Sequence, residues 1–350
     1  MKAVMKQEEG YDKMDLVEVL EPKVRKDWVK IQVAYCGICG TDLLAFKGQY
    51  PSSLSPLILG HEFSGVIVEM GPEVKWLKKG MRVVSETTFE TCGVCIHCRE
   101  AEYNLCSNRI GIGTQKDGGM AEYVLAPQSS VHVLPDNVKL RTAALMEPLA
   151  CGIHAGIEKG KIAKGEVVCV FGAGAIGLLL SSVAKACGAY VISAGIASDS
   201  ERLALARRMG VDRTVDQSVE SIEEVIAELT KGLGADKVFE CSGAVQALNV
   251  GLKIVRKKGK VIQMGVFPHR HESIATELIL QKEIEYLGSR SQKPSSWEKA
   301  IQLLREECLN GLDELSSFVL PLEEWRTGFE IMMDGSAIKV LLKCENPEGE

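Results

Sequence analysis

The sequence predicts an α/β protein that combines a β-rich first part with a doubly wound parallel sheet. Up to about residue 150, short β-branched runs such as WVKIQVAYCGI, FSGVIVEMG and MRVVSE are separated by Gly, Pro and charged turns. From about residue 154, strand-like segments alternate with helical segments, as in parallel strands joined by crossover helices. A glycine-rich turn joins the first of these strands to its helix.

The strands of the expected parallel sheet follow one another in a regular order. They are EVVCVF, AYVISA, RTVD, KVFEC, GKVIQMG and IEYLGS, and helical stretches such as SDSERLALARRMG separate them. After about residue 295 the chain returns to helix and strand pieces that end in KVLLKC and are expected to rejoin the first part. We therefore expect a first domain over 1–153, a dinucleotide-binding domain over 154–295 and a return segment over 296–350.

Charge and composition exclude some classes of function. The net charge is −6 with 25% charged residues, and no block of like charge gives a footprint for nucleic acid or for an anionic membrane. The start MKAVMKQEEG carries charges in place of an apolar signal core, and no run approaches the roughly eighteen apolar residues that cross a bilayer. We expect a cytoplasmic protein without a nucleic-acid or membrane partner.

Four of the 12 cysteines lie in the stretch CGVCIHCREAEYNLC, at Cys92, Cys95, Cys98 and Cys106. In a reducing compartment, clustered thiols are more often metal ligands than disulfides. Four thiolates form a closed tetrahedral zinc site that leaves no position for substrate, so a zinc ion here would hold a lobe of about residues 90–108 together. Unrelated buried thiols or a disulfide pair are the alternatives.

The turn GAGAIG supplies the strongest sign of a coenzyme. Gly172, Gly174 and Gly177, with Ala175 and Ile176 between the last two, follow the apolar strand and begin a helix. In a dinucleotide site the first glycine permits the tight turn, the second lets pyrophosphate approach, and the third allows the helix to pack on the strand. A purely structural turn is the alternative.

The choice between NAD and NADP rests on the end of the second strand. An acidic residue is expected about twenty positions after the glycine turn to bind the ribose 2′-hydroxyl, but Gly195 stands there. Ser198, Ser200 and Arg202 could hold a 2′-phosphate, whereas the neighbouring Asp199 and Glu201 would repel it. The loop leans weakly toward NADP, and Arg202 is equally explained as a solvated helix residue.

Two further loops follow the fourth and fifth strands of the sheet, where a doubly wound fold meets its ligand. We expect Cys241, Ser242, Gly265 and Val266 in these loops to contact the nicotinamide half of the coenzyme.

A third group of residues lies in the β-rich part. CGICGTD, GHE and MEPLACG contribute Cys39, His61 and a carboxylate from Glu62 or Glu147. These are ligands suited to zinc with a position left open, which is the arrangement of a catalytic metal. Such a zinc ion is a Lewis acid that lowers the pKa of a bound hydroxyl, so that hydride can pass to a nicotinamide.

In order and spacing, these motifs resemble the zinc-dependent medium-chain dehydrogenase/reductases, and within them the sorbitol (polyol) dehydrogenase-like branch. The resemblance covers nearly the whole chain and implies a GroES-like catalytic domain, a Rossmann coenzyme domain and a short C-terminal return. It implies that Thr41 hydrogen-bonds the reacting hydroxyl, that Asp42 orients His61, and that Glu147 separates this branch from ethanol-oxidising relatives, which have a cysteine there. The expected substrate is the secondary alcohol of a polyol or sugar alcohol, and the expected assembly is a homodimer or homotetramer.

Some features depart from the family or carry less. Many relatives have a histidine where this chain has Leu44, so the outward proton relay must run by water or a coenzyme ribose hydroxyl. L-threonine 3-dehydrogenase activity is an alternative, as is a non-catalytic NAD(P)- and zinc-binding redox sensor. The remaining histidines that lack partners at metal spacing are expected at the surface or as caps: His132, His154, His269 and His271.

Overall fold

The computed structural model describes residues 1–50, 54–269 and 271–344, and the chain divides into two compact units. The first unit holds residues 1–147, 293–305 and the chain from Leu315 onward, and the second holds Pro148–Gln292 and Glu306–Glu314. The first division falls inside helix α4 (Met146–Ile153), where no change of composition marks it. The expected boundary at 153/154 lies six residues later, at the end of that helix.

The segment Glu306–Glu314 was expected to belong to the return segment, but it packs with the second unit. Glu314 accepts a hydrogen bond of 2.7 Å from Nε of Arg208. A side chain at Gly311 would meet Met209 at 2.8 Å, which shows how closely the segment packs there.

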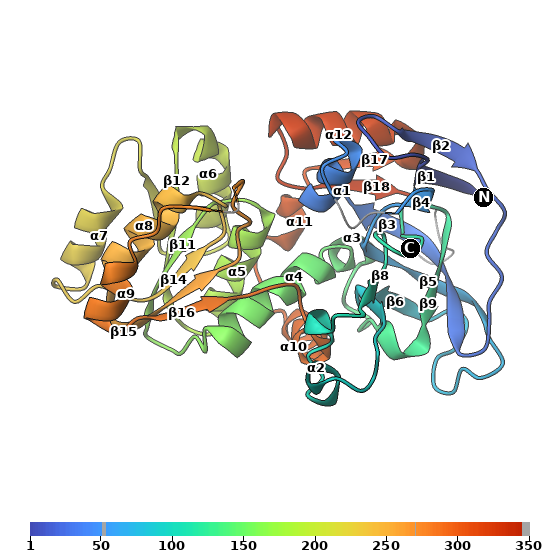
Figure 1. Cartoon of the computed structure of the whole chain (residues 1–350), viewed down its shortest axis with the longest axis horizontal. Helices are drawn as coiled ribbons and strands as arrows, with labels where there is room; N and C mark the ends of the chain where they lie inside the picture. Colours follow the sequence, from blue (N-terminus) through green and yellow to red (C-terminus); the bar gives the residue numbers. More distant parts are fainter. Residues whose placement is uncertain (51–53, 270, 345–350) are drawn as a thin grey trace. The chain divides into compact units, whose positions relative to one another are not determined.

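The first unit is built on one large sheet with the strand order β10-β6-β5-β3-β18-β17, in which β9 also pairs with β3. Its strands are β3 (Trp28–Gly37), β5 (Glu62–Met70), β6 (Arg82–Ser85), β9 (Tyr123–Pro127), β10 (Val131–Val133), β17 (Phe318–Pro321) and β18 (Val340–Lys343). Strands from the two ends of the sequence therefore lie side by side, as Figure 1 shows for β3 in blue and β18 in red.

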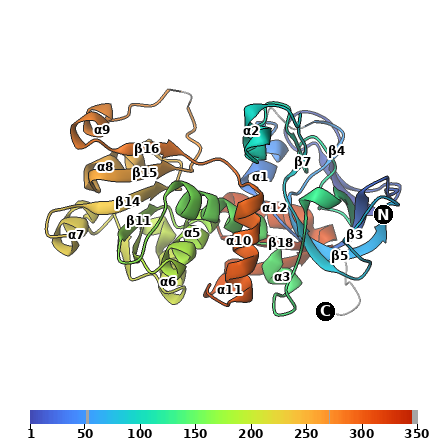
Figure 2. The same cartoon turned by 90° about the horizontal axis from the view of Figure 1, so that it is seen from below.

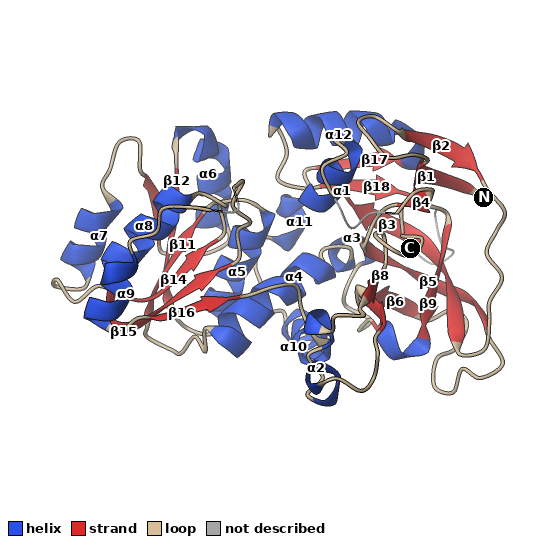
Figure 3. Ribbon diagram, viewed as in Figure 1, coloured by secondary structure: helices blue, strands red, loops and turns tan. Residues whose placement is uncertain are grey.

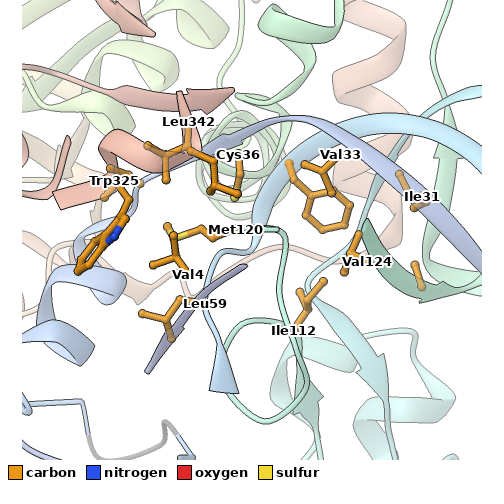
Figure 4. Close-up of a cluster of buried hydrophobic side chains, with 14 of the residues drawn as sticks. Val4, Ile31, Val33, Cys36, Leu59, Ile112, Met120, Val124, Trp325 and Leu342 are labelled. Carbon is orange, nitrogen blue, oxygen red and sulfur yellow. The ribbon is translucent and has the colours of Figure 1, made fainter. Parts of the chain in front are cut away.

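Strand β3 lies between β5 and β18 in this sheet, and almost every position of WVKIQVAYCG is buried. β-branched and aromatic residues suit such a pleated, two-sided position. Its last residue, Gly37, is opposite Glu62 of β5 on one side and Leu341 of β18 on the other. Figure 4 shows part of the core around this strand, where Cys36 lies beside Leu342 of β18 and Ile31 lies beside Val124 of β9. All four residues belong to one buried cluster.

Smaller elements complete the first unit. One small sheet pairs β1 (Lys2–Lys6) with β2 (Met14–Glu18) and with β4 (Leu57–Ile58). A second small sheet pairs β7 (Thr88–Glu90) with β8 (Ile110–Gly111). The α-helices are α1 (Gly40–Phe46), α2 (Ile96–Arg99), α3 (Leu140–Ala143), α10 (Pro294–Arg305) and α12 (Trp325–Asp334). Helix α11 (Leu312–Leu315) lies at the last division of the chain, between Glu314 and Leu315. Short 3-10 helices cover Tyr103–Leu105, Gln128–Ser130 and Leu322–Glu324.

The second unit is a parallel sheet with the strand order β13-β12-β11-β14-β15-β16. Its strands are β11 (Val167–Phe171), β12 (Tyr190–Gly195), β13 (Arg213–Asp216), β14 (Ala235–Glu240), β15 (Val255–Gln263) and β16 (Glu285–Gly288). In sequence order this is the 3-2-1-4-5-6 arrangement of a Rossmann fold, which confirms the predicted fold class. The register aligns Phe171 with Ala194 and with Glu240, so the loops that follow these strands meet at one edge.

Helices cover both faces of this sheet, which Figure 3 draws in red between blue helices. They are α5 (Ala175–Ala186), α6 (Ser200–Arg208), α7 (Ile222–Leu229), α8 (Val245–Ile254) and α9 (Thr276–Lys282), with a π-helix over His154–Lys159 and a 3-10 helix over Ala197–Asp199. Figure 2 shows α5 and α6 on one face and α8 and α9 on the other. Both faces of the central strands β11, β12 and β14 are buried, which explains their continuous apolar runs.

Among the residues that the structure describes, no helix combines the length and the apolar character that crossing a bilayer requires.

Candidate zinc and coenzyme sites

The four cysteines of the stretch at 92–106 come together in the first unit. Cys95 precedes the short helix α2, Cys98 lies within it, and Cys106 follows the 3-10 turn. The Sγ atoms of Cys92 and Cys98 are 3.8 Å apart, those of Cys95 and Cys98 3.5 Å, and those of Cys92 and Cys106 3.7 Å. Four sulfurs at about 2.3 Å from a zinc ion stand about 3.8 Å apart in a tetrahedron, so the spacing fits that ion.

The backbone of this lobe also prepares the sulfurs for a cation. Gly93 has a φ of +70°, a left-handed conformation that glycine adopts without strain, and it lets the chain turn between Cys92 and Cys95. The backbone N–H of Cys95 donates to Sγ of Cys92. The N–H of Val94 is the main reason that the pKa of the Cys92 thiol falls to about 6. N–H groups directed at a sulfur stabilise its thiolate, which is the form that binds metal.

A second cluster of ligand atoms joins Cys39, His61 and Glu62, whose ligand atoms all lie within 4.8 Å of one another. Cys39 immediately precedes α1, and its backbone N–H donates to Oδ2 of Asp42 at 2.8 Å. Glu62 begins β5, and Gly60 allows the approach to that strand. Gly60 has a φ of +94°, and a side chain there would meet Sγ of Cys36 at 2.6 Å.

His61 lies among anionic partners. Its Nδ1 is buried, lies 3.8 Å from Oδ1 of Asp42 and has no hydrogen bond to any residue that the structure describes. Its Nε2 is 3.5 Å from Oγ1 of Thr41. Burial opposes protonation of the ring, but Cys39 and Asp42 nevertheless hold the pKa of His61 well above its usual range. This electrostatic environment attracts a cation, and a ring nitrogen grouped with the thiol of Cys39 and the carboxylate of Glu62 fits zinc.

Glu62 is held by a residue that the sequence did not point to. Nζ of Lys339 donates to both carboxylate oxygens, at 2.9 and 2.7 Å, and to the carbonyl of Ile38 at 3.0 Å. Both side chains are almost completely buried. Gly37 makes room for this carboxylate, since a Cβ there would lie 2.5 Å from Oε2. Glu62 is therefore neutralised before any metal binds.

Glu147 lies close to this cluster, but its carboxylate is not among the ligand atoms that group with Cys39 and His61. It is buried in the first turn of α4, and its charge raises the pKa values of both His61 and Lys339. Of the two expected carboxylates, Glu62 is thus the one the geometry joins to the metal cluster. Glu147 adds negative potential from beside it.

The glycines of the coenzyme turn have separate tasks in the second unit. Gly172 has a φ of +93°, and a side chain there would meet Ser242 at 2.8 Å. A Cβ on Gly174 would face open space, whereas one on Gly177 would lie 1.9 Å from the carbonyl oxygen of Gly172. The turn, the open approach and the tight helix contact are those a pyrophosphate site requires. Gly174 directly precedes α5, whose first N–H groups can bind phosphate.

A cavity of about 540 Å³ opens beside this turn. Of the predicted coenzyme residues, Gly172, Gly174, Gly195, Arg202, Cys241 and Ser242 line it. Among the described residues, its lining does not include Ala175, Ile176, Gly177, Gly265 or Val266. Gly265 has a structural task instead, since a Cβ there would lie 2.4 Å from both Oε2 of Glu240 and the backbone N of Gly243.

Comparison with known proteins shows the family of the chain. The alcohol dehydrogenase GroES-like domain matches residues 25–136, and the zinc-binding dehydrogenase domain matches residues 175–306. The chain belongs to the zinc-binding alcohol dehydrogenase family. It is an NAD(P)-dependent oxidoreductase of this family, with the GroES-like and Rossmann folds predicted for it.

Several relatives of this dehydrogenase match it over almost their whole length. D-arabitol-phosphate dehydrogenase of Enterococcus avium is 48% identical, covering 99% of this chain and 98% of the relative. Sorbitol dehydrogenase of Halalkalibacterium halodurans is 46% identical, covering 98% and 99%. A zinc-binding dehydrogenase of Sinorhizobium meliloti, solved bound to NADP, superposes with a TM-score of 0.90 at 32% identity and covers 98% of each chain.

The contact of Lys339 with Glu62 was not predicted from the sequence, and two histidines lie in surroundings other than those predicted. His154, expected at the surface or as a cap, is buried, and its Nδ1 lies 2.6 Å from Oε2 of Glu158. His132 stacks on Trp297 and lies 2.8 Å from Oε1 of Glu86. The i,i+4 spacing of His154 and Glu158 was a usable signal, whereas the partners of His132 and Lys339 are distant in sequence.

Proposed function

We propose that this dehydrogenase oxidises a secondary alcohol of a polyol or polyol phosphate to the ketone and transfers hydride to NAD or NADP. The observation that carries the proposal is the cluster of Cys39, His61 and Glu62, which offers sulfur, nitrogen and oxygen within 4.8 Å of one another. Three protein ligands leave a position open, as a catalytic zinc needs. We propose a second, structural zinc at Cys92, Cys95, Cys98 and Cys106.

The residues around the catalytic cluster have defined tasks in this proposal. When bound, zinc supplies Lewis acidity that lowers the pKa of the substrate hydroxyl, and the nicotinamide coenzyme accepts the hydride. Asp42, whose Oδ1 lies 3.8 Å from Nδ1 of His61, would orient the ring when the metal is bound, as partners of metal-binding histidines commonly do. Thr41, with its hydroxyl 3.5 Å from Nε2 of His61, is placed to accept a hydrogen bond from the reacting alcohol.

The proton released by the alcohol must then leave the site. Leu44 cannot pass it on, because its side chain has no group that carries a proton. We propose that Thr41 hands the proton to water or to a ribose hydroxyl of the coenzyme. Glu147 contributes a negative charge beside the cluster that would favour binding of the metal cation.

The substrate is proposed from the names of the relatives. One relative acts, by its name, on D-arabitol phosphate and another on sorbitol, so the shared chemistry is a polyhydroxy secondary alcohol. L-threonine 3-dehydrogenases are less similar, at 33% identity for the protein of Bacillus velezensis. We therefore favour a polyol over threonine, and leave the phosphate group as the variable to test.

The test is a substrate panel with the purified, zinc-loaded protein. Free polyols, polyol phosphates and L-threonine are each supplied with NAD and with NADP, and nicotinamide reduction is followed by absorbance. Turnover of a polyol or polyol phosphate above that of threonine supports the proposal. Preferred turnover of threonine supports the alternative enzyme, and coenzyme binding without turnover of any alcohol supports a redox sensor.

We also propose that the protein works in the cytoplasm as a homodimer or homotetramer. None of the cysteines, all of which lie among the described residues, forms a disulfide bond, as is usual in a reducing compartment. Light scattering of the purified protein and fractionation of cells that produce it are the direct checks.

A further inference from the structure

The end of β12 lacks the acidic side chain of a dinucleotide site, but the space for it is filled. A Cβ built on Gly195 would lie 3.0 Å from both Cβ and Oδ2 of Asp199 and 3.3 Å from its Cγ. The carboxylate of Asp199 therefore lies directly over the strand end, where a side chain of residue 195 would begin. Gly195 and Asp199 both line the coenzyme cavity.

Asp199 is held in this position by the loop that follows the strand. Its Oδ2 accepts a hydrogen bond of 3.1 Å from the backbone N–H of Ile196, and its own N–H donates to the carbonyl of Ile196 at 2.8 Å. The loop is in turn tied to the next strand, because Ala197 donates to Oγ of Ser218 and Gln217 donates to the carbonyl of Gly195. The carboxylate is thus directed back toward the strand end by a fixed set of bonds.

Part of this orientation is a capping contact, because Asp199 is the last residue of the 3-10 helix Ala197–Asp199 and its carboxylate accepts a hydrogen bond from the N–H of Ile196, which precedes that helix. Asp199 precedes α6, yet its side chain makes no capping hydrogen bond to that helix. The bond to Ile196 holds the carboxylate beside the cavity that Asp199 lines, and 19% of the side chain remains exposed. A carboxylate held at the end of the second strand is the group that accepts the ribose hydroxyl of NAD in this fold.

Arg202 lies one helical turn further along and also lines the cavity. Its Nη1 is 3.7 Å from Oδ1 of Asp199. A 2′-phosphate that approached Arg202 would meet the carboxylate beside it, and two like charges at such short range repel each other. The same carboxylate offsets the guanidinium charge, which weakens the attraction of Arg202 for phosphate.

We propose that Asp199 takes the place of the missing acidic residue at Gly195 and selects NAD over NADP, with Arg202 as the residue it restrains. This inference rests on the proposed function. It reverses the weak lean toward NADP drawn from the loop sequence, because the structure brings Asp199 over the strand end. Removing the charge of Asp199 leaves Arg202 to bind the 2′-phosphate and shifts the preference to NADP.

The test measures dissociation constants for NADH and NADPH by fluorescence titration, so it requires neither substrate nor turnover. The variants are Asp199→Ala, Asp199→Asn, and each of these with Arg202→Ala. Asn retains an acceptor for the Ile196 N–H while it removes the charge, so a change seen in both variants is not a folding defect. The matched control is Glu201→Ala, which removes a carboxylate two residues from Asp199. The side chain of Glu201 is exposed and is not part of the cavity lining.

We expect the wild type to bind NADH more tightly than NADPH. The ratio of the two dissociation constants should move toward NADPH by about ten-fold or more in both Asp199 variants, because a hydrogen bond to a charged group is lost and a repulsion is removed. The added Arg202→Ala change should abolish the gain in NADPH affinity, and Glu201→Ala should leave the ratio unchanged. An unchanged ratio in both Asp199 variants, or a wild type that prefers NADPH, overturns the inference and leaves the proposed function intact. Failure of the wild type to bind either coenzyme overturns the proposed function and this inference together.

Discussion

Nζ of Lys339 lies 2.7 Å from Oε2 and 2.9 Å from Oε1 of Glu62, although the two residues are 277 positions apart. The pairing of β3 with both neighbours creates this contact, since Gly37 is opposite Glu62 on one side and Leu341 on the other. The C-terminal return of the chain therefore supplies the cation that neutralises a carboxylate of the catalytic cluster.

Lys339→Met should strand the buried Glu62 charge and lower the free energy of unfolding by about 3–5 kcal/mol, as urea denaturation would measure. Adding Glu62→Gln should recover most of that loss, because no unpaired charge then remains. Lys258→Met is the control, since Lys258 pairs with Glu283 at the exposed surface and should change stability by less than about 1 kcal/mol. A Lys339→Met protein as stable as the wild type would refute the account of this pair.

Cys95→Ser should lower the melting temperature and reduce zinc content by one ion per chain, because a structural zinc contributes folding free energy. The matched control is Cys308→Ser, which changes an exposed thiol outside both clusters. Elemental analysis and thermal unfolding of both variants are the measurements. Equal melting temperatures and equal zinc content would show that the four sulfurs hold no metal.

His61→Ala should leave a folded protein that still binds coenzyme but turns over its substrate about a hundred-fold more slowly or worse. The ring supplies a metal ligand and no part of the hydrophobic core, so coenzyme titration should match the wild type. His271→Ala removes an exposed histidine and serves as the control. Full activity in the His61 variant would contradict the assignment of the catalytic cluster.

Glu147→Gln should weaken zinc retention and turnover by about ten-fold, which is the lower end of the effect of groups that support metal ligands. The substitution keeps the shape of the side chain and removes a buried negative charge near His61. Glu330→Gln makes the same change at an exposed position of α12. If Glu147→Gln retained zinc and activity like the wild type, Glu62 would be the only carboxylate that matters.

The features that could be predicted from the sequence are those set by local patterns. Gly172, Gly174 and Gly177 work within one strand, turn and helix, so their tasks follow from spacing and the apolar flanks. The four cysteines at 92–106 are likewise close in sequence, so their spacing predicts that their sulfurs can meet. The parallel sheet followed from the alternation of buried strands with helices.

The features that could not be predicted depend on contacts between segments that are distant in sequence, or on the direction of a side chain. Lys339 reaches Glu62 only through the strand order, which no motif encodes. Asp199 was recognised as a charge that would repel phosphate, but its hydrogen bond to Ile196, which turns it over Gly195, is a property of the folded loop. The choice between Glu62 and Glu147 likewise needed their positions relative to His61.

The most direct test of the zinc-dependent mechanism is a chelator titration in which zinc content, turnover and melting temperature are measured on the same samples. The open cluster of Cys39, His61 and Glu62 should release its ion before the closed four-sulfur lobe does. We expect two zinc ions per untreated chain. Removal of the first ion should abolish polyol turnover while the melting temperature stays near that of the untreated protein. Polyol turnover that persists in a protein stripped of that ion would contradict it.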